Sequence, residues 1–411
     1  MKIAIVSHYF ETHRGGVEIV AGGLMRALAR LGHEVVWLAC DVTPPPTPVN
    51  NAASVVLPAT NVLENRAGIP MPIPTPAGAA RIFRCVREAD AVLVHDALYP
   101  TSVLAFLAAR LWRKPFIVAA HVGIIPYRSR WVRLTLALAN GVIARPLLAH
   151  ADRVAFVSEI TATFFATVRF RAPPVMIFNG VDTDIFHPAA SAAGRTALRE
   201  RLGQPQHRAL VLFVGRFVEK KGLHIVEQMA RQRPDILWAL AGWGRIDPDR
   251  WGLNNIKVFS GLSGESLATL YQASDALVLP SVGEGYPLVI QEALACGLPV
   301  VCGDEAAWAD PAAREFLTPV AMNRDDPDAI AAEFGAAVDR VLADPAGRAP
   351  QAAARHRFVA ERYSWAACAA RYIELLGLAA APAGARRPGR SASPVIVGRD
   401  APLSRTERGA P

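Results

Sequence analysis

Residues 274–302, SDALVLPSVGEGYPLVIQEALACGLPVVC, contain one complete unit of the architecture that the rest of the chain follows. An apolar run, ALVLP, leads into a loop with two glycines, and Pro287 and Gly297 suit the start and the stop of a helix after that loop. The next apolar run, LPVVC, follows the stop directly. Two apolar runs joined by a helix predict parallel strands, because strands that run in the same direction need a crossover connection.

The same alternation extends over both halves of the 411-residue chain. In the first half the apolar runs are residues 3–6, 35–39, 55–57, 91–94, 116–119, 154–157 and 175–178. After a polar, alanine-rich passage they resume at residues 209–215, 236–242, 256–259, 276–280 and 298–302. Because this length exceeds one ordinary core, we expect an α/β protein with two Rossmann-like, doubly wound parallel-sheet domains, residues 1–188 and 189–357. A tail rich in Ala, Pro and Arg, residues 379–411, is expected to be disordered.

The bulk composition excludes several classes of protein. No apolar run reaches the ~18 residues that span a bilayer, and the N-terminus is typical of a first strand and not of a signal peptide, so we expect a cytoplasmic protein. Five scattered cysteines without a CxxC pair predict neither a disulfide framework nor a zinc site. Half of the formal net charge of +8 lies after Leu378, so a nucleic-acid-binding surface is not expected.

Three histidines of the first half lie at or just after strand ends. They are His8, His95 and His121. Open parallel sheets bind ligands beyond the carboxyl ends of their strands, so these side chains share the edge where a ligand would bind. A single strand-end histidine is usually structural, and the expectation is that at least one of the three contacts substrate.

Two further strand ends carry groups suited to phosphate. Gly15 and Gly16 precede a helix whose N-terminal N–H groups and dipole would favour an anion, although a tight turn explains the pair about as well. In LVLFVGRFVEKKG, residues 210–222, Arg216 and Lys221 follow a strand. Two cations there could clamp a diphosphate, with solvated surface charge as the alternative.

Two acids stand eight residues apart in the opening stretch. Glu284 lies in the glycine-flanked loop at the strand end, and Glu292 lies about a turn and a half into the helix. Glu292 is too far from the helix start to compensate the dipole alone. A carboxylate on such a helix is suited to accept hydrogen bonds from ribose hydroxyls, as the acid of dinucleotide-binding folds does.

Several motifs together resemble the retaining glycosyltransferases of family four, which have the GT-B fold. The motifs are GGVE (15–18), VGRFVEKKG (214–222), SDALVLPS (274–281) and two glutamates separated by seven residues. NGVDTDIFHP (179–188) and HADRVAFVSE (150–159) are also similar to that family. The resemblance covers residues 1–376 and implies two domains facing a cleft, with the acceptor bound mainly by the first and a nucleotide-sugar donor mainly by the second.

The resemblance also implies roles for single residues in donor binding. Arg216 and Lys221 would hold the donor diphosphate, Glu284 the hydroxyls of the transferred sugar, and Glu292 the ribose. The fixed cations would stabilise the leaving diphosphate without a metal ion. No metal site is therefore expected, and the Asp-x-Asp triplets at 182–184, 247–249 and 326–328 are not interpreted as one.

In the first domain the resemblance implies that His121 is the histidine near the reacting sugar and Gly16 the glycine of a phosphate-facing loop. Segment 358–376 resembles the closing helix that crosses back to the first domain. The chain departs from the family pattern after Val301, where CGDEAAWADPAAREFL replaces the usual Gly-Gly and further Glu.

The expected activity is transfer of a hexose to a glycan or lipid-linked acceptor, in bacterial cell-surface polysaccharide or glycolipid synthesis. A GT-B epimerase or phosphorylase, or a non-catalytic protein that binds nucleotide sugars, is the alternative. An NAD-dependent oxidoreductase is disfavoured because Gly242-Trp-Gly244 is not followed by the third glycine of that motif.

Residues 124–150 raise the question of membrane contact. Arg128, Arg130 and Arg133 precede a strongly apolar stretch, and basic plus apolar surface favours anionic lipid. A buried helix of the first domain with a charged entry loop is the alternative interpretation.

Overall fold

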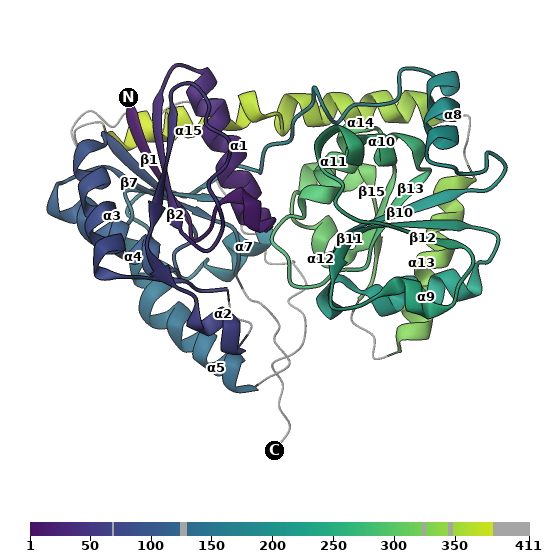
Figure 1. The fold of residues 1–411 in the computed structure, drawn as a ribbon, viewed down its shortest axis with the longest axis horizontal. Helices are drawn as coiled ribbons and strands as arrows, with labels where there is room; N and C mark the ends of the chain where they lie inside the picture. Colours follow the sequence, from purple (N-terminus) through teal and green to yellow (C-terminus); the bar gives the residue numbers. More distant parts are fainter. Residues whose placement is uncertain (68–69, 124–129, 323–325, 344–347, 381–411) are drawn as a thin grey trace. The chain divides into compact units, whose positions relative to one another are not determined.

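The computed structural model describes residues 1–67, 70–123, 130–322, 326–343 and 348–380. The chain divides into two compact units, shown in Figure 1. The first holds Met1–Gly180 and the helix that begins at Trp365, and the second holds Val181–Ser364. The chain thus leaves the first unit before the boundary expected at residue 188. The tail expected to be disordered lies outside the described residues from 381 onward.

The first unit is built on a seven-stranded sheet in the order β3-β2-β1-β6-β7-β8-β9. Every strand pair in it is parallel, as the alternation of apolar runs and helices predicts. Its strands are β1 (Lys2–Val6), β2 (Glu34–Cys40), β3 (Ala52–Leu57), β6 (Ala91–His95), β7 (Phe116–Ala120), β8 (Arg153–Phe156) and β9 (Val175–Met176). A separate antiparallel pair joins β4 (Ala59–Thr60) to β5 (Ile73–Pro74).

Helices cover both faces of this sheet because its strands are apolar on both faces. Successive residues of β1 alternate between two cores, with Ala4 and Val6 in one and Ile3 and Ile5 in the other. The Ile3 core includes side chains of α1 and α15, and the Ala4 core includes side chains of α3, α4 and α6. The helices of the unit are α1 (Gly16–Arg30), α2 (Val62–Ala67), α3 (Pro76–Glu88), α4 (Pro100–Leu111), α5 (Arg130–Ala139), α6 (Arg145–His150), α7 (Glu159–Phe164) and α15 (Trp365–Ala380), with a 3-10 turn at Glu11–His13 and a π-helical turn at Asn140–Ala144.

The second unit has a six-stranded parallel sheet in the order β12-β11-β10-β13-β14-β15. Its strands are β10 (Leu210–Phe217), β11 (Leu237–Gly244), β12 (Ile256–Phe259), β13 (Ala276–Leu279), β14 (Val300–Gly303) and β15 (Leu317–Val320). Its helices are α8 (Ala192–Arg201), α9 (Leu223–Gln232), α10 (Gly264–Ala273), α11 (Leu288–Ala295), α12 (Asp304–Ala307), α13 (Pro327–Leu342) and α14 (Arg348–Arg362). Shorter 3-10 segments are Glu219–Lys221, Pro248–Trp251 and Pro311–Phe316.

The segment expected to be one closing helix, residues 358–376, is divided between two helices. The first, α14, ends at Arg362 in the second unit, and α15 begins at Trp365 in the first. The break is fixed at Tyr363, whose carbonyl accepts a hydrogen bond from the Val181 N–H at 2.7 Å. In the first unit α15 packs on α1, and the Trp365 ring fills the space above Gly23 and Gly180, where any Cβ would overlap it. No helix among the described residues is long and apolar enough to cross a bilayer.

Candidate active site

Two loops of the second unit bring Lys221 and Glu284 together at the carboxyl ends of β10 and β13. Lys221 Nζ lies 2.7 Å from Oε1 and 2.8 Å from Oε2 of Glu284, and Lys220 Nζ lies 3.9 Å from Oε1. Burial by itself would raise the pKa of Glu284, but Lys221, Lys220 and Arg216 together hold that pKa below its ordinary value. Glu284 is therefore a carboxylate, with both oxygens against a cation.

A left-handed glycine positions these loops. Gly222 has a φ of +70°, and a Cβ there would lie 2.1 Å from the Pro280 carbonyl oxygen, so only glycine permits this approach. The N–H of Val282 donates to the Lys220 carbonyl at 3.0 Å. This hydrogen bond joins the main chain of the turn after β10 to that of the loop after β13. The turn carries Lys221 and the loop carries Glu284, so the two side chains are held close together.

Arg216 lies near the end of β10 and is exposed. Its side chain forms no hydrogen bond or ion pair with another described residue, and its charge contributes to the lowered pKa of Glu284. The structure therefore gathers Arg216, Lys221 and Glu284 at one strand edge. Lys221 is paired with Glu284, whereas the Arg216 guanidinium remains available to bind an anion.

Glu292 occupies a different environment, on α11 more than one turn from the helix start at Leu288. Its Oε2 accepts a hydrogen bond from the Tyr271 hydroxyl at 2.8 Å. Burial raises the pKa of the Glu292 carboxyl to about 7, although the Tyr271 hydrogen bond lowers it in part. The two acids therefore differ in pKa. Nearby cations lower the pKa of Glu284, whereas burial raises that of Glu292 to about 7.

In the first unit the three strand-end histidines gather, as expected for neighbouring strands. His95 Nδ1 lies 2.9 Å from His121 Nε2, and both side chains are buried. His8 Nε2 lies 2.9 Å from Glu18 Oε1, and the His8 ring stacks on Tyr99 with centroids 3.8 Å apart. Burial lowers the pKa of His95 well below its ordinary value and that of His121 to about 3, so both imidazoles of this pair are neutral.

The main chain at His121 is held by Asp96, which follows β6 with a φ of +65°. Asp96 Oδ1 accepts hydrogen bonds from the N–H groups of His121 at 2.6 Å and Val122 at 3.2 Å. Burial raises the pKa of Asp96 to about 6. Left-handed backbone at a non-glycine residue is uncommon, and here it directs a carboxylate toward the loop after the neighbouring strand.

Glu18 is a site residue that the sequence reasoning missed. It is buried, and its carboxylate turns back over the start of its own helix, because a Cβ on Gly15 would lie 2.0 Å from Glu18 Oε2. A Cβ on Gly16, the glycine predicted to face phosphate, would meet nothing within 4 Å, so there is open space at that position. Burial by itself would raise the pKa of Glu18, but His8 and His13 lower it. An acid two residues after a Gly-Gly helix start was the available signal.

Glu305 was also missed, and it lies in the stretch where the chain departs from the family pattern. Its Oε2 accepts a hydrogen bond from the Gly283 N–H at 2.9 Å. Gly283 directly precedes Glu284, so a second carboxylate supports the loop of the first. The available signal was the acid in CGDEAAW, close after the strand end at Gly303.

The three Asp-x-Asp triplets form local turns. In each triplet the first aspartate accepts a hydrogen bond from the N–H of the second, at 3.1 Å for Asp182, 3.3 Å for Asp247 and 2.9 Å for Asp326. Asp247 and Asp326 also occupy the N-cap positions of the segments that follow them. Their spacing is therefore explained by a local turn at Asp182 and by capping at Asp247 and Asp326.

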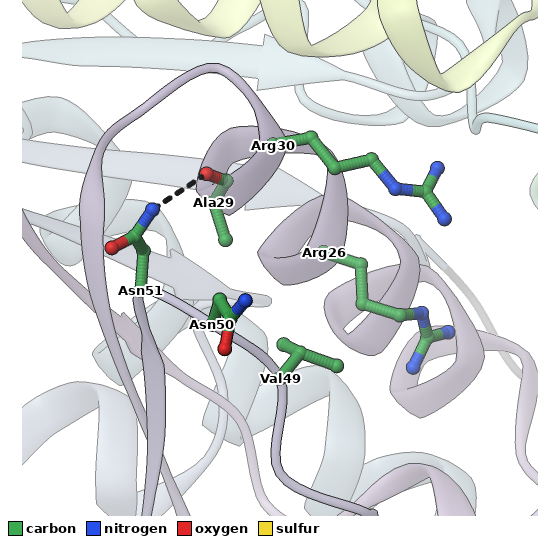
Figure 2. Close-up of a pocket in the computed structure, with 6 residues that line it drawn as sticks. All are labelled: Arg26, Ala29, Arg30, Val49, Asn50 and Asn51. Carbon is green, nitrogen blue, oxygen red and sulfur yellow. Dashed lines mark hydrogen bonds between the residues drawn. The ribbon is translucent and has the colours of Figure 1, made fainter.

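A hollow elsewhere on the first unit contains none of the predicted site residues (Figure 2). It is lined by Arg26, Ala29, Arg30, Val49, Asn50 and Asn51. Arg26 is bound by Glu11 through two hydrogen bonds, and Asn51 donates to the Ala29 carbonyl at 3.4 Å. Figure 2 shows the Arg26 and Arg30 side chains extending away from Asn51, so the polar groups do not converge on one point.

Comparison with known proteins gives relatives over most of the chain. A GDP-mannose-dependent alpha-(1-6)-phosphatidylinositol monomannoside mannosyltransferase from Mycolicibacterium smegmatis is 29% identical over 74% of this chain and 81% of its own. A D-inositol 3-phosphate glycosyltransferase from Xylanimonas cellulosilytica is 28% identical over 92% of this chain and 94% of its own.

Solved structures share the fold at lower sequence identity. Sucrose-phosphate synthase from Thermosynechococcus elongatus has a TM-score of 0.68 and 22% identity, covering 91% of this chain and 98% of its own. HepE from Anabaena, in complex with UDP-glucose, has a TM-score of 0.67 and 19% identity, covering 92% and 99%.

Family comparison divides the chain into two adjoining matches. Residues 14–185 match Glycosyltransferase Family 4, and residues 194–365 match Glycosyl transferases group 1. The two matches together span most of the sequence, and the expected fold of two parallel-sheet α/β domains is confirmed. The chain therefore belongs to the family four glycosyltransferases, GT-B enzymes that transfer a sugar from a nucleotide-sugar donor.

Proposed function

We propose that this enzyme transfers a hexose, with retention of configuration, from a nucleotide-sugar donor to a glycan or a lipid-linked acceptor. The observation that carries the proposal is the group at the ends of β10 and β13, where ionised Glu284 contacts Lys221 beside Lys220 and Arg216. Departure of a nucleoside diphosphate builds negative charge, and cations fixed beforehand stabilise that charge.

In this reaction the bond between C1 of the sugar and the diphosphate breaks. The oxygen of an acceptor hydroxyl bonds to C1, and the proton of that hydroxyl passes to an oxygen of the leaving diphosphate. Arg216 and Lys221 would hold the diphosphate, Glu284 the sugar hydroxyls and Glu292 the ribose. In the first unit, we assign His121 to the reacting sugar and Gly16 to a phosphate-facing loop. Because side-chain cations supply the charge, we expect transfer to continue in EDTA.

A binding and turnover screen tests this function. Saturation-transfer NMR with UDP-, GDP- and ADP-sugars on the purified protein should identify a donor, and adding external sugar or polyol acceptors should then yield a glycoside. An epimerase would instead return an isomer of the donor sugar, and a phosphorylase would consume inorganic phosphate. Absence of binding by any nucleotide sugar would contradict the proposal.

The relatives suggest the class of acceptor. One is named for action on phosphatidylinositol monomannoside and another for D-inositol 3-phosphate, which are a lipid-linked and a free polyol. We propose an acceptor of this kind, used in synthesis of cell-surface polysaccharide or glycolipid, with the enzyme in the cytoplasm and in peripheral contact with the inner face of the membrane.

One surface of the first unit supports membrane contact. Leu134, Leu138 and Val142 recur every four residues along α5 and the π-helical turn, and they are 62%, 65% and 65% exposed. No described side chain of α5 is buried, which contradicts the alternative of a buried helix for this part of the segment. Buried residues appear further on, at Leu147 and Leu148 of α6.

The sequence on either side of this surface favours anionic lipid as its occupant. No acid occurs between Asp96 and Asp152, while seven Lys and Arg residues do. Of the arginines expected to contribute, Arg133 is exposed on α5, whereas Arg128 and the side chain of Arg130 lie outside the described residues. A basic, acid-free stretch with an apolar face is complementary to an anionic bilayer.

Co-sedimentation with vesicles tests the membrane contact. Wild-type protein should sediment with phosphatidylglycerol-containing vesicles at low salt and much less with neutral vesicles. Replacing Leu134, Leu138 and Val142 by Ser should abolish this, whereas Leu31→Ser, which changes a 50% exposed leucine after α1, should not. Equal sedimentation of all three proteins would remove the proposed membrane face.

A further inference from the structure

Glu305 occupies a defined place beside the loop that carries Glu284. It lies in α12, directly after β14, and β14 pairs in parallel with β13. The carboxyl ends of these two strands therefore meet at one edge, and the loop after β13 lies within reach of the first turn after β14. Glu305 uses this proximity, because its Oε2 accepts a hydrogen bond from the Gly283 N–H at 2.9 Å.

The hydrogen bond holds a backbone that is otherwise free to vary. Gly283 has a φ of +67°, and Gly285 follows Glu284, so the peptide on each side of Glu284 belongs to a glycine. Glycine populates many backbone conformations, and a loop of this kind needs an external contact to fix one of them. Two contacts of this kind hold the loop. The Glu284 side chain pairs with Lys221, and the Gly283 N–H donates to the Glu305 carboxylate.

The electrostatic surroundings of Glu305 differ from those of Glu284. Burial raises the pKa of Glu305, and Asp304 and Glu284 add repulsion, while the Gly283 N–H acts in the opposite direction. Glu305 forms no ion pair with a described Lys or Arg, whereas Lys221 balances Glu284. The end of the site that would receive the sugar therefore presents a carboxylate that no described Lys or Arg neutralises.

We propose that Glu305 is a positioning residue that holds the Gly283–Gly285 loop, and Glu284 with it, and that its carboxylate selects donor sugars that carry no negative charge. The inference rests on the proposed function, because it assigns Glu284 to the transferred sugar. A neutral hexose offers hydroxyl donors to this edge, whereas a hexuronate would bring a second carboxylate to it.

Two substitutions separate holding the loop from selecting by charge. Glu305→Gln keeps an oxygen that can accept from the Gly283 N–H but removes the charge, and Glu305→Ala removes both. The matched controls are Glu315→Gln and Glu315→Ala, at an exposed acid ten residues further along the same segment.

Hydrogen exchange tests the positioning without any ligand. In the peptide covering residues 281–287, exchange should be about tenfold faster in Glu305→Ala than in wild type, as expected for loss of a hydrogen bond worth roughly 1.4 kcal/mol. Glu305→Gln should stay near wild type, as should both Glu315 variants. Unchanged exchange in Glu305→Ala would overturn the positioning role.

Donor selectivity tests the charge. Calorimetry should compare UDP-glucose with UDP-glucuronate, and GDP-mannose with GDP-mannuronate. The preference for the neutral sugar should fall by about tenfold in both Glu305 variants, while affinity for free UDP or GDP stays unchanged. Catalytic turnover should fall mainly in Glu305→Ala, which a purely electrostatic role would not produce.

The outcomes separate the inference from the proposed function. If a nucleotide sugar binds and the preference is the same in all variants, the selectivity claim is wrong while the function stands. If no nucleotide sugar binds wild type, the proposed function fails, and hydrogen exchange still decides whether Glu305 positions the loop.

Discussion

Lys221 and Glu284, which are 63 residues apart in the chain, form a single ion pair, with Nζ 2.7 Å from one carboxylate oxygen and 2.8 Å from the other. The cation assigned to the diphosphate and the acid assigned to the sugar are therefore partners of each other. Each side chain is only 13% exposed, so water solvates neither charge well and each is compensated by the other. An arriving diphosphate would compete with Glu284 for Lys221 and leave the carboxylate freer to accept sugar hydroxyls.

Removing Lys221 should destabilise the second unit. Loss of one partner of a largely buried pair costs about 3 kcal/mol, because the remaining charge is left uncompensated. Since the folded-state pKa of Glu284 lies below its unfolded value, the pair contributes stability that is present above the unfolded pKa and is lost as pH falls through the folded one. The difference in Tm between wild type and Lys221→Ala should be clear at pH 7 by calorimetry and should shrink below about pH 4.

The matched control for this change is Arg250→Ala. The Arg250 side chain is 86% exposed and pairs only locally with Asp247 at 3.0 Å, so its removal should leave Tm almost unchanged. If Lys221→Ala behaves like Arg250→Ala at pH 7, the ion pair contributes nothing to folding and its place in the site rests on donor binding alone.

Arg216→Ala should weaken donor handling without a matching loss of stability. The guanidinium is exposed and forms no ion pair with a described residue, so folding loses little. Losing a charge-assisted hydrogen bond to the diphosphate should reduce kcat/KM by about 10- to 150-fold. Steady-state kinetics on the donor found in the screen measures this, with EDTA present throughout. Kinetics equal to wild type would rule out Arg216 as part of the diphosphate clamp.

The sequence predicted the elements of the site better than its contacts. The depth of Glu292 on its helix followed from Pro287 and Gly297, which mark the helix ends through local backbone preferences. The pairing of Lys221 with Glu284 did not follow, because it depends on the left-handed turn at Gly222 against the Pro280 carbonyl. The contact between Gly222 and Pro280 depends on how β10 and β13 are aligned in the sheet, and the apolar runs do not specify that alignment.

The residues that were missed share one property. Glu18 and Glu305 act on neighbouring main chain or side chains, and short motifs describe residues that contact ligand more readily than residues that support them. The division of the closing segment at Tyr363 was missed for a related reason. Its signal is a long-range hydrogen bond from Val181 and not a Pro or Gly in the segment.

The His95–His121 pair should make the first unit sensitive to acid. Both folded-state pKa values lie below the unfolded value, so the unfolded chain binds more protons once pH falls below about 6.5. Stability is therefore lost progressively as pH falls from about 6.5 toward 3, the folded-state pKa of His121. In His95→Asn this slope should be smaller, by up to about 1.4 kcal/mol per pH unit, even though the variant loses a buried hydrogen bond. His207→Asn, at an exposed position of the second unit, is the control, and equal slopes in all three proteins would contradict the neutral pair.

Glu284 and Glu292 should affect different parts of one donor, because their surroundings differ. Glu284 lies in the glycine-flanked loop among three cations, and Glu292 lies on α11 with the Tyr271 hydroxyl as its partner. A ribose contact is common to the free nucleoside diphosphate and the full donor, so Glu292→Ala should weaken both equally. Glu284→Ala should leave nucleotide affinity unchanged and should lower turnover, since its hydrogen bonds matter most as the sugar approaches the oxocarbenium-like transition state.

Calorimetry with the nucleoside diphosphate on both alanine variants decides between shared and divided roles. Neither acid is assigned as a general base, so Glu284→Gln and Glu292→Gln should each keep part of the activity, because an amide oxygen still accepts a hydroxyl hydrogen bond. Glu292→Gln carries a further readout, since wild type has a carboxyl with a pKa of about 7 and the amide cannot titrate. If the carboxylate is the better ribose acceptor, nucleotide affinity should rise with pH through 7 in wild type and stay flat in Glu292→Gln. Equal loss of nucleotide affinity in both alanine variants, or loss in neither, would mean that position on loop or helix does not decide which part of the donor each acid contacts.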